Sequence, residues 1–283
     1  MKIRKRNKEK VKSERERWRK GVYVLPNIFT TLNLFCGFVA IISAMEGSFE
    51  KSAHLLIAAM AFDILDGKVA RATRTTSRFG VEYDSLADVI SFGMAPGLMV
   101  YLWLLQPMGK FGWLAAMIFL ACGALRLARF NTNAATADSR WFTGLPIPAA
   151  AGMLATIILF CHKIGLTINP KDPNFILIYF ILAGIYALSF LMVSSIKYAS
   201  FKKLPTFLTR EKNFNLLVIA VLLLVFIVQE PSVALFSLNF LYVVSGPFNS
   251  IYRRHAGQSD SDEVAKTPGV KTGDDNHQST SQI

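Results

Sequence analysis

The sequence predicts an all-α fold, a bundle of helices that crosses a membrane several times. Of the 283 residues, 52% are hydrophobic and only 18% are charged, and the mean hydropathy is +0.37, which places the chain outside the ordinary soluble class. The apolar residues come in blocks that are long enough to cross roughly 30 Å of hydrocarbon as helices. Because these blocks lack the alternation of a transmembrane strand, we expect helices and not a barrel.

Eight membrane spans are expected, and long apolar blocks define the clearest of them. These blocks are Ile28 to Met45, Phe111 to Leu125, Phe175 to Ile196 and Phe214 to Val228. The second and third spans carry charged residues at one end, and the last two leave open a re-entrant hairpin in place of two full crossings. With the weaker blocks included, the spans cover about 28–46, 52–70, 83–105, 111–130, 148–165, 175–196, 213–229 and 232–251.

The composition divides the chain into four parts. A basic segment, residues 1–22, precedes a membrane domain over 23–200, and a pair of C-terminal membrane helices occupies 201–255. The tail, residues 256–283, is rich in Ser, Asp, Gly, Lys and Gln and has no apolar periodicity. We therefore expect the tail to be disordered.

Basic residues are distributed unevenly between the two sides of the predicted membrane. The formal net charge is +12, and the opening MKIRKRNKEKVKSERERWRK holds a dense run of Lys and Arg. Most other basic residues fall in every second connection between spans. With an even number of spans, the positive-inside rule places both termini and the connection 68–78 on the cytoplasmic side. The basic N-terminus is then a topology signal that also touches anionic membrane lipids, and we expect no nucleic-acid partner.

Four aspartates gather in the stretch FDILDGKVARATRTTSRFGVEYDSLADVISFG, residues 62–93. Helical spacing places them, with small residues and an arginine, on one face of each of two successive helices. The first face carries Asp63, Asp66, Gly67, Ala70 and Arg71, and the second carries Gly80, Asp84 and Asp88. If the two faces pack together, four carboxylates converge at the cytoplasmic edge of the membrane.

Carboxylates this close repel one another, so the cluster needs a positive charge between them. Oxygen ligands without His or Cys favour a hard divalent cation, Mg²⁺ or Mn²⁺ with Ca²⁺ as a further candidate, over zinc. Four carboxylates exceed what one Mg²⁺ usually takes from a protein, so we expect two ions that bridge phosphate oxygens. Gly67, Ala70 and Gly80 leave room for a large ligand against the helices. Arg71 adds a positive charge suited to a pyrophosphate.

Simpler explanations exist for each residue taken alone. A single aspartate near a helix end is ordinarily a solvated cap, and a single glycine is ordinarily a packing contact between membrane helices. Four acids and an arginine on two facing helices are not explained in this way, because they would be destabilising at the membrane edge without a ligand. A cation transporter, the non-enzymatic alternative, would place its acids in mid-span beside a broken helix, whereas these lie at one membrane edge.

The aspartates form part of a longer pattern. Asp63-x-x-Asp66-Gly67-x-x-Ala70-Arg71, eight residues, Gly80-x-x-x-Asp84-x-x-x-Asp88 resembles the signature of the CDP-alcohol phosphatidyltransferase family. The resemblance covers roughly residues 20–200. It implies a homodimeric membrane enzyme with a six-helix core, here followed by two further C-terminal membrane helices, in which metal ions hold the pyrophosphate of a CDP-linked lipid.

The resemblance also implies roles for individual residues. Asp63, Asp66 and Asp84 would be metal ligands, and Asp88 would be both a ligand and the general base. Contacts with the CDP-linked lipid are expected from the start of the first span and from the signature. The expected contact residues are Asn27, Thr30, Thr31, Gly67, Ala70, Arg71, Ser77 and Gly80.

Four further stretches resemble the phosphatidylserine synthase branch of that family. They are PNIFTTLNLFCGFVA (26–40), RFGVEYDSLADVISFGMAP (78–96), ALRLARFN (124–131) and FTGLPIPAAAG (142–152). This resemblance implies that CDP-diacylglycerol and L-serine are the substrates, that phosphatidylserine and CMP are the products, and that the enzyme lies in a bacterial inner membrane. Sister enzymes that use glycerol phosphate, inositol, choline or ethanolamine share the aspartates, so the signature alone leaves the acceptor open.

Three polar residues near the end of the fourth span are candidate serine ligands. Arg126 and Arg129 stand at its cytoplasmic end, close to the level of the aspartates. A guanidinium there would bind the serine carboxylate through two hydrogen bonds, and Asn131 is expected to assist. The alternative, that the arginines are positive-inside residues or bind lipid phosphate, also stays open.

Overall fold

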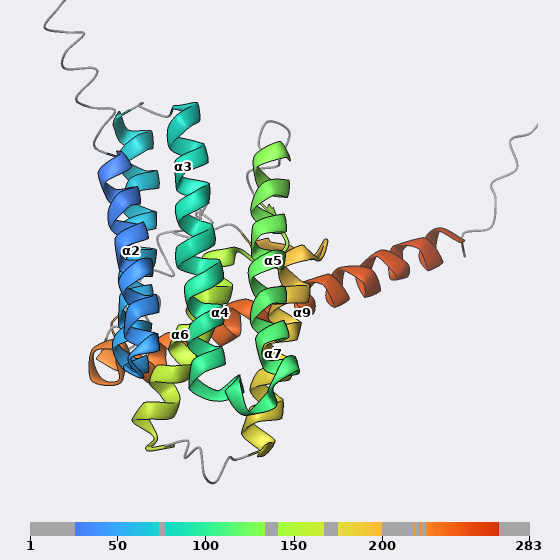
Figure 1. The fold of residues 1–283 in the computed structure, drawn as a ribbon. Helices are drawn as coiled ribbons and strands as arrows, with labels where there is room; N and C mark the ends of the chain where they lie inside the picture. The colour runs from blue at the N-terminus through green and yellow to red at the C-terminus, as the bar shows by residue number, and fades with distance from the viewer. Residues whose placement is uncertain are drawn as a thin grey trace, which may run out of the picture.

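A computed structural model describes residues 26–73, 77–133, 141–166, 175–199, 218, 221 and 225–265 of the chain. The described residues confirm the all-α fold, and Figure 1 shows a bundle in which successive long helices run in opposite directions. The first helix spans Pro26–Met45. The helices that follow are α2 (Phe49–Thr73), α3 (Arg78–Asp88), α4 (Ala95–Val100), α5 (Lys110–Asn133), α6 (Ile147–Lys163), α7 (Phe175–Val193) and α9 (Pro231–Ala265).

α3 and α4 belong to one continuous helix, Arg78–Met108, whose winding changes along its length. A π-helical turn, η1 (Val89–Met94), separates α3 from α4. A second π-helical turn, η2 (Tyr101–Leu105), follows α4 and leads into a short 3₁₀ turn, η3 (Gln106–Met108). Because π turns inside a helix often mark functional sites, it is relevant that η1 begins directly after Asp88.

Five helices in the described part of the chain are long and apolar enough to cross a membrane. They are Pro26–Met45, Arg78–Met108, Lys110–Thr132, Ile176–Val193 and Pro231–Ser250. Two further predicted spans correspond to α2, whose 25 residues include the charged signature, and to α6, a shorter apolar helix. The protein is therefore a multi-pass membrane protein. The predicted seventh span, 213–229, lies largely outside the described residues.

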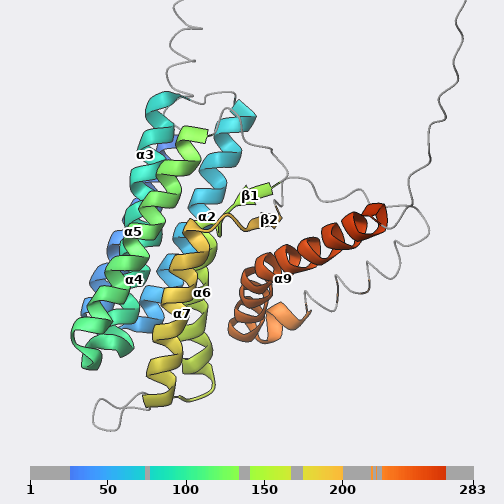
Figure 2. The same cartoon turned by 90° about the vertical axis from the view of Figure 1, so that its right-hand side faces the viewer.

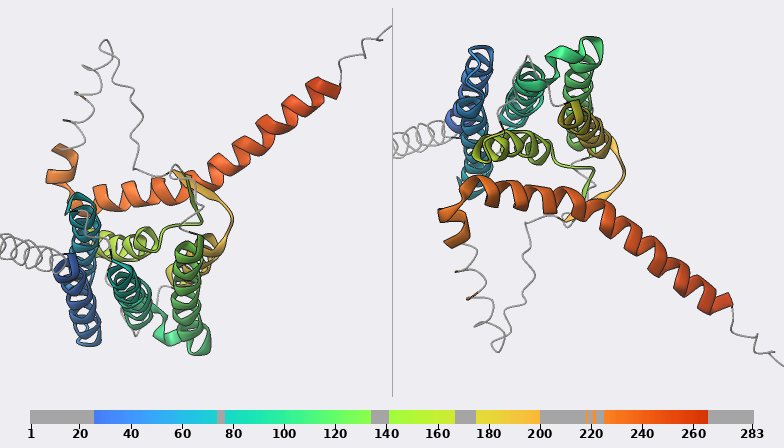
Figure 3. Two further views of the ribbon diagram at one scale, coloured as in Figure 1. Left: turned by 90° about the horizontal axis from the view of Figure 1, so that it is seen from above. Right: turned by 90° about the horizontal axis from the view of Figure 1, so that it is seen from below.

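α9 differs from the prediction in its length and course. The predicted span 232–251 lies within it, but the helix continues to Ala265. The described helix thus covers the first ten residues of the predicted tail, and the disorder expected of residues 256–283 stays a prediction. A helix that is already nucleated gains a hydrogen bond for each residue it adds, which favours its continuation. Figures 2 and 3 show that α9 crosses the bundle obliquely and then leaves it.

The first half of α9 is attached to α6. Lys163 at the end of α6 forms an ion pair with Glu230, at a distance of 3.0 Å between Nζ and Oε2. One turn into α9, the ring of Phe236 stacks on the ring of Phe160 with centroids 4.7 Å apart. These two contacts position the start of α9 at the end of α6.

A short two-stranded ribbon lies where the chain enters α6 and leaves α7. Its strands, β1 (Trp141–Thr143) and β2 (Lys197–Ala199), are antiparallel. Gly144 follows β1 with a φ of 79°, which glycine adopts without strain, and its N–H donates to the Ile196 carbonyl at 2.8 Å. The sequence did not predict this ribbon, because three-residue strands are too short to show an alternating pattern.

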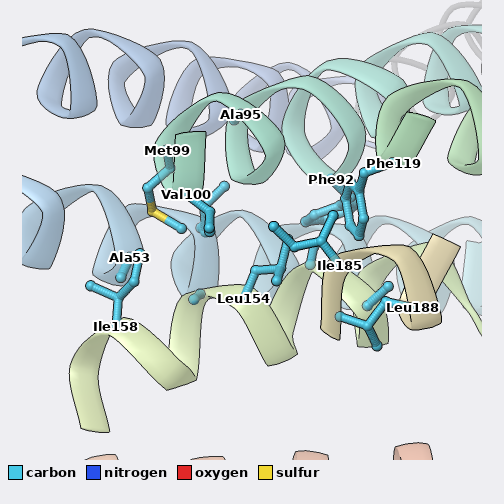
Figure 4. Close-up of a cluster of buried hydrophobic side chains, with 14 of the residues drawn as sticks. Ala53, Phe92, Ala95, Met99, Val100, Phe119, Leu154, Ile158, Ile185 and Leu188 are labelled. Atoms are coloured by element: carbon cyan, nitrogen blue, oxygen red, sulfur yellow. The ribbon is translucent and has the colours of Figure 1, made fainter. Parts of the chain in front are cut away.

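Small and branched side chains fill the space between the helices. Figure 4 shows Ala53 of α2, Met99 of α4 and Ile158 of α6 in one buried cluster that continues through Phe119 of α5 and Ile185 of α7. α4 lies at the centre, in contact with α2, α5 and α6. Since lipid tails are as apolar as these side chains, close packing is what favours helix association here.

The first helix approaches η1 closely at Gly37. A Cβ atom placed on Gly37 would lie 2.7 Å from the Cα atom of Ser91 in η1. Next to this contact, the Ser91 hydroxyl donates to the Asn33 carbonyl at 3.1 Å. The close approach therefore fixes the first helix against the turn that begins after Asp88.

Replacement of Gly37 by alanine should destabilise the protein. The added methyl group would overlap the Cα atom and the side chain of Ser91, and overpacking of this kind typically costs about 1–3 kcal/mol. Gly184→Ala in α7 is the matched control, because a Cβ atom at Gly184 meets nothing within 4 Å. We expect a lower Tm for the purified Gly37→Ala protein in detergent and an unchanged or higher Tm for the control. Equal Tm values for the two variants would contradict the packing described here.

Candidate active site

In Figure 1 the first helix begins, α2 ends and α3 begins toward the upper end of the bundle. The signature residues lie on α2 and α3. α2 carries Asp63 and Asp66, and α3 carries Asp84. The three carboxylates each offer an oxygen, and these oxygens lie within 4.8 Å of one another. We call these three residues the aspartate triad. Their spacing along each helix and the packing of α2 beside α3 bring them together, as the sequence predicts.

The triad fits a divalent cation. Asp66 is only 5% exposed, and within the described part of the chain the buried Oδ1 of Asp84 has no hydrogen-bond partner. Carboxylate oxygens this close repel one another strongly in a partly buried site, because the surroundings screen charge poorly. A hard cation with a preference for oxygen would remove that repulsion and give the Asp84 oxygen a partner.

Asp88 stands apart from the triad. It is not a member of the metal-ligand group, and its Oδ1 accepts a hydrogen bond of 3.1 Å from the Nδ2 of Asn33 on the first helix. Both side chains are buried. The structure therefore groups three of the four predicted ligands within 4.8 Å. Asp88, one helical turn beyond Asp84, is near enough to interact electrostatically with all three, and its role as a fourth ligand stays a prediction.

Asn33 is a site residue that the sequence prediction missed. Its side chain is fully buried, and its Oδ1 has no hydrogen-bond partner among the described residues. The sequence did contain a signal that could have placed Asn33 in the site: it lies three residues after Thr30 and therefore shares a face of the first helix with it. Without a partner in view, however, one asparagine in an apolar span is not distinguishable from a packing residue.

The start of the first helix contacts the triad through Thr30. The Thr30 hydroxyl donates to Asp66 Oδ2 at 2.9 Å. Thr31 faces another way, since its hydroxyl donates to the Asn27 carbonyl at 2.7 Å and lies 3.1 Å from the Tyr83 hydroxyl. Of the two threonines expected to contact the CDP-linked lipid, only Thr30 reaches the triad.

A pocket of about 190 Å³ opens beside the triad. All the residues expected to contact the CDP-linked lipid line it, with the exception of Thr31. The lining residues are Pro26, Asn27, Thr30, Asp66, Gly67, Ala70, Arg71, Ser77, Gly80, Val81 and Asp84. The first helix, α2 and α3 therefore each form one wall of the pocket.

Ser77 and Gly80 shape the edge of this pocket. Ser77 is the N-cap of α3, where its side-chain oxygen accepts a hydrogen bond of 2.9 Å from the Gly80 N–H. Such a cap satisfies one of the free donors at a helix start. A Cβ atom on Gly80 would lie 3.1 Å from Ser77 Oγ and 3.5 Å from Asn27 Oδ1. A side chain at position 80 would therefore crowd the Ser77 hydroxyl that caps α3 and touch the Asn27 side chain of the first helix.

Arg126 on α5 points toward the acids from the side. It is only 7% exposed, and its buried Nε has no hydrogen-bond partner among the described residues. Its guanidinium lies over the ring of Phe130, 5.6 Å from the centroid. Of the three candidate serine ligands, Arg126 is the one close enough to an aspartate, Asp88, to interact with it electrostatically.

Arg129 has a structural task. Its guanidinium donates to the carbonyls of Val193 (2.8 Å), Thr143 (3.0 Å), Ser194 (3.2 Å) and Met192 (3.4 Å). The last carbonyls of a helix lack partners within the helix, so Arg129 caps the end of α7 and fastens it to β1. These hydrogen bonds occupy Nη1 and Nη2, and they explain the presence of an arginine at this position without a bound substrate.

Asn131 also makes a contact between helices. Its Nδ2 donates to the Ser85 hydroxyl at 2.8 Å, and that hydroxyl donates in turn to the Val81 carbonyl at 2.9 Å. Asn131 therefore ties α5 to α3 beside the triad. Its place supports a role in positioning α3 more directly than a role in binding an acceptor.

Comparison with known proteins gives the family. The sequence profile of CDP-alcohol phosphatidyltransferases matches residues 23–190. The chain belongs to the CDP-alcohol phosphatidyltransferase family. A CDP-diacylglycerol–serine O-phosphatidyltransferase of Helicobacter pylori strain 26695 is 37% identical over 225 residues, which cover 80% of this chain and 90% of that protein.

Two further relatives differ in how much of the chain they match. The archaetidylserine synthase of Methanothermobacter thermautotrophicus is 36% identical over 176 residues, 62% of this chain and 69% of that protein. A CDP-diacylglycerol–serine O-phosphatidyltransferase of Bacillus subtilis strain 168 is 35% identical over 179 residues, 63% of this chain and 92% of that protein. The Bacillus relative is thus a shorter chain. In this CDP-alcohol phosphatidyltransferase, the profile match ends within α7, so β2 and α9 lie outside it.

Replacement of Gly67 by alanine should weaken substrate binding without weakening the fold. A Cβ atom there would first meet Arg71 Nη1 at 3.5 Å, an ordinary contact, and alanine favours a helix interior by about 1 kcal/mol over glycine. The methyl group would nevertheless enter the pocket wall. We expect the KM for a CDP-linked lipid to rise about fivefold or more, while the Tm stays the same or rises.

The same Gly184→Ala variant serves as the control for Gly67→Ala, since it adds the same methyl group to a helix away from the pocket. It should leave the KM unchanged. An unaltered KM in Gly67→Ala would show that the ligand does not lie against this part of α2.

Proposed function

We propose that this protein transfers the phosphatidyl group of CDP-diacylglycerol to the hydroxyl group of L-serine, which yields phosphatidylserine and CMP. The observation that carries the proposal is the meeting of three elements in one site: the aspartate triad, the separately held Asp88 and the buried Arg126. The names of the Helicobacter and Bacillus relatives support the same reaction.

The pocket beside the triad would hold the CDP end of the donor lipid. Asp63, Asp66 and Asp84 would hold the divalent ions, for which we favour two Mg²⁺ or Mn²⁺ ions, with Ca²⁺ as a further candidate. When bound, such ions would neutralise the pyrophosphate charge and make the phosphorus a better electrophile. Arg71 lines the same pocket, where its guanidinium would bind phosphate oxygens through paired hydrogen bonds.

Asp88 is placed to act as the general base. Its carboxylate would accept the proton of the serine hydroxyl while the serine oxygen forms a bond to the phosphorus that carries the diacylglycerol. The bond from that phosphorus to the bridging oxygen breaks at the same time, and CMP departs with the electron pair. The hydrogen bond from Asn33 holds one oxygen of Asp88 in place and leaves the other for the acceptor.

Arg126 would bind the carboxylate that distinguishes serine from a simple alcohol. A buried guanidinium with an unused donor is unfavourable without an anionic partner. The serine carboxylate would supply that partner and accept two parallel hydrogen bonds. The serine hydroxyl would then face Asp88, which interacts with the same arginine.

We also propose an orientation and an assembly. The basic residues near the triad, such as Lys68, Arg71 and Arg78, favour the cytoplasmic side for the triad and both termini. A bacterial cell membrane, which is the inner membrane where the cell has two, fits the relatives from Helicobacter and Bacillus. A homodimer follows from the family resemblance.

Two other functions predict different acceptors or no reaction. A sister enzyme acting on glycerol phosphate or inositol would use the same triad, but a phosphate dianion would call for more than one cation at the acceptor site. A cation transporter would need acids in mid-span, whereas Asp63 and Asp66 lie in the second half of α2, toward its end at Thr73. The single buried arginine beside Asp88 favours an acceptor with one carboxylate.

The purified protein should release CMP from CDP-diacylglycerol only when L-serine is present. The reaction is followed in detergent micelles with Mg²⁺ or Mn²⁺, with glycerol 3-phosphate and inositol as competing acceptors. Serine should raise CMP release well above both alternatives, with phosphatidylserine formed in equal amount. Release that responds to glycerol 3-phosphate or inositol instead would assign the chain to a sister activity.

Replacement of Asp88 by asparagine should abolish turnover and retain binding of the donor. An amide cannot accept the serine proton, and loss of a general base typically lowers kcat by about 10²–10⁴-fold. Glu82→Gln on the same helix is the matched control, because Glu82 is exposed and the change also removes one carboxylate charge. Turnover near the control level in Asp88→Asn would remove Asp88 from the role of base.

A further inference from the structure

Asn33 combines a hydrogen bond to the proposed general base with an acceptor atom that is not used. Its Nδ2 donates to Asp88 Oδ1 at 3.1 Å, and its side chain is fully buried. The oxygen of the same amide, Oδ1, has no hydrogen-bond partner within the described part of the chain. Because a buried acceptor without a partner is unfavourable, this atom calls for a donor that the described residues do not supply.

The orientation of the Asn33 amide is set by its surroundings. An ionised carboxylate only accepts hydrogen bonds, so the amide must turn its nitrogen, and not its oxygen, toward Asp88. The backbone of Asn33 is also held, because its carbonyl accepts a hydrogen bond of 3.1 Å from the Ser91 hydroxyl. Nδ2 and Oδ1 are bonded to one carbon atom, so the unused oxygen stays close to Asp88.

The place of Asn33 on the first helix directs it to the acceptor side of the site. Thr30, one turn earlier on the same face, donates to Asp66 of the triad, whereas Asn33 reaches Asp88. On the opposite side of the sequence, Arg126 of α5 is buried and close enough to Asp88 to interact with it electrostatically. Asp88 therefore has a polar neighbour on each of two helices, and neither neighbour belongs to the triad.

The proposed acceptor has three polar groups, and only two of them have been matched so far. The carboxylate of serine would lie on Arg126 and its hydroxyl at Asp88. The ammonium group donates hydrogen bonds and accepts none, as in lysine, and burying it without an acceptor would be strongly unfavourable. Since the hydroxyl and the ammonium are on neighbouring carbon atoms, a serine whose hydroxyl reaches Asp88 brings its ammonium close to the side chain that is bonded to Asp88.

We propose that Asn33 is a specificity-determining residue of the acceptor site, and that its Oδ1 accepts a hydrogen bond from the ammonium group of the acceptor. A neutral amide suits this place, because a second carboxylate there would repel Asp88. The inference rests on the proposed function, since it assumes an amino-acid acceptor. It supplies a contact that glycerol phosphate and inositol, which have no ammonium group, could not make.

The test compares two acceptors that differ only in the ammonium group. 3-Hydroxypropionate keeps the hydroxyl and the carboxylate of serine and lacks its amino group. The measured quantity is kcat/KM for L-serine divided by kcat/KM for 3-hydroxypropionate, with CDP-diacylglycerol in detergent micelles. For the wild type this ratio should be at least about tenfold, as expected for a hydrogen bond to a charged group. A ratio near one in the wild type would overturn the inference without any variant.

Asn33→Ala in the full-length protein should lower this ratio about tenfold. The variant also loses the hydrogen bond to Asp88, which should lower kcat for both acceptors. That loss cancels in the ratio, because both acceptors react through the same hydroxyl and the same base. If turnover is too slow, the same ratio is taken from dissociation constants, measured by calorimetry with CDP and Mg²⁺ present.

Ser43→Ala is the matched control. Ser43 lies on the same helix, near its far end at Met45, and its buried Oγ also has no hydrogen-bond partner among the described residues. The control should leave the ratio as in the wild type. An equal fall of the ratio in Ser43→Ala would overturn the inference, because the effect would then come from a disturbance of the whole first helix.

Two other results with Asn33→Ala would also overturn the inference. An unchanged ratio with a lower kcat for both acceptors would leave Asn33 as a positioning residue for Asp88 alone. An unchanged ratio with a higher requirement for Mg²⁺ would place a metal ion on Oδ1 instead of an ammonium group.

The outcome also distinguishes this inference from the proposed function. If the wild-type protein depends on serine and the ratio does not respond to Asn33→Ala, the inference fails and the function stands. If the wild-type protein uses neither serine nor 3-hydroxypropionate and releases CMP with glycerol 3-phosphate or inositol, both fail, and the wild-type assay alone reveals it.

Discussion

The mutual repulsion of three carboxylates is the constraint on which the site depends. Their oxygens lie within 4.8 Å of one another at the end of packed membrane helices, where charges are poorly screened. Three helices must be held firmly to keep them there. The hydroxyl of Thr30 binds Asp66, Ser77 caps α3, and Gly37 lets the first helix lie against η1. Each contact limits the separation that repulsion would otherwise favour, and a bound cation would complete the balance.

Asp88 and the aspartate triad have different surroundings. Asp66 and Asp84 of the triad line the pocket together with Arg71, whereas Asp88 accepts from Asn33 and lies on the side of Arg126. In the proposed reaction, a donor with a pyrophosphate and an acceptor with a hydroxyl would approach from different sides. The reacting phosphorus would lie between them, and the protein contributes mainly positions and charges, as in phosphoryl transfer generally.

The sequence predicted what depends on spacing within a helix and missed what depends on contacts between distant segments. Asp63, Asp66 and Asp84 could be grouped because residues three or four apart share a helix face. Asn33 could not be paired with Asp88 in this way, because 55 residues separate them. Arg129 looked equivalent to Arg126 until the structure placed it against the end of α7. The course of α9 likewise depends on a close contact between Gly246 and the ring of Tyr198 in β2, and neither residue carries a local signal.

The π turn after Asp88 separates the orientation of the acids from the packing of the rest of their helix. A π turn holds one residue more than an α turn, and one residue corresponds to about 100° of rotation. The segment before η1 can therefore direct Asp84 and Asp88 inward, while α4 after it turns a different face to its neighbours. Changes in the buried core around Met99 need not rotate the acids. The helix therefore has two segments whose rotations about the helix axis are set separately: α3 carries the site residues, and α4 packs in the core.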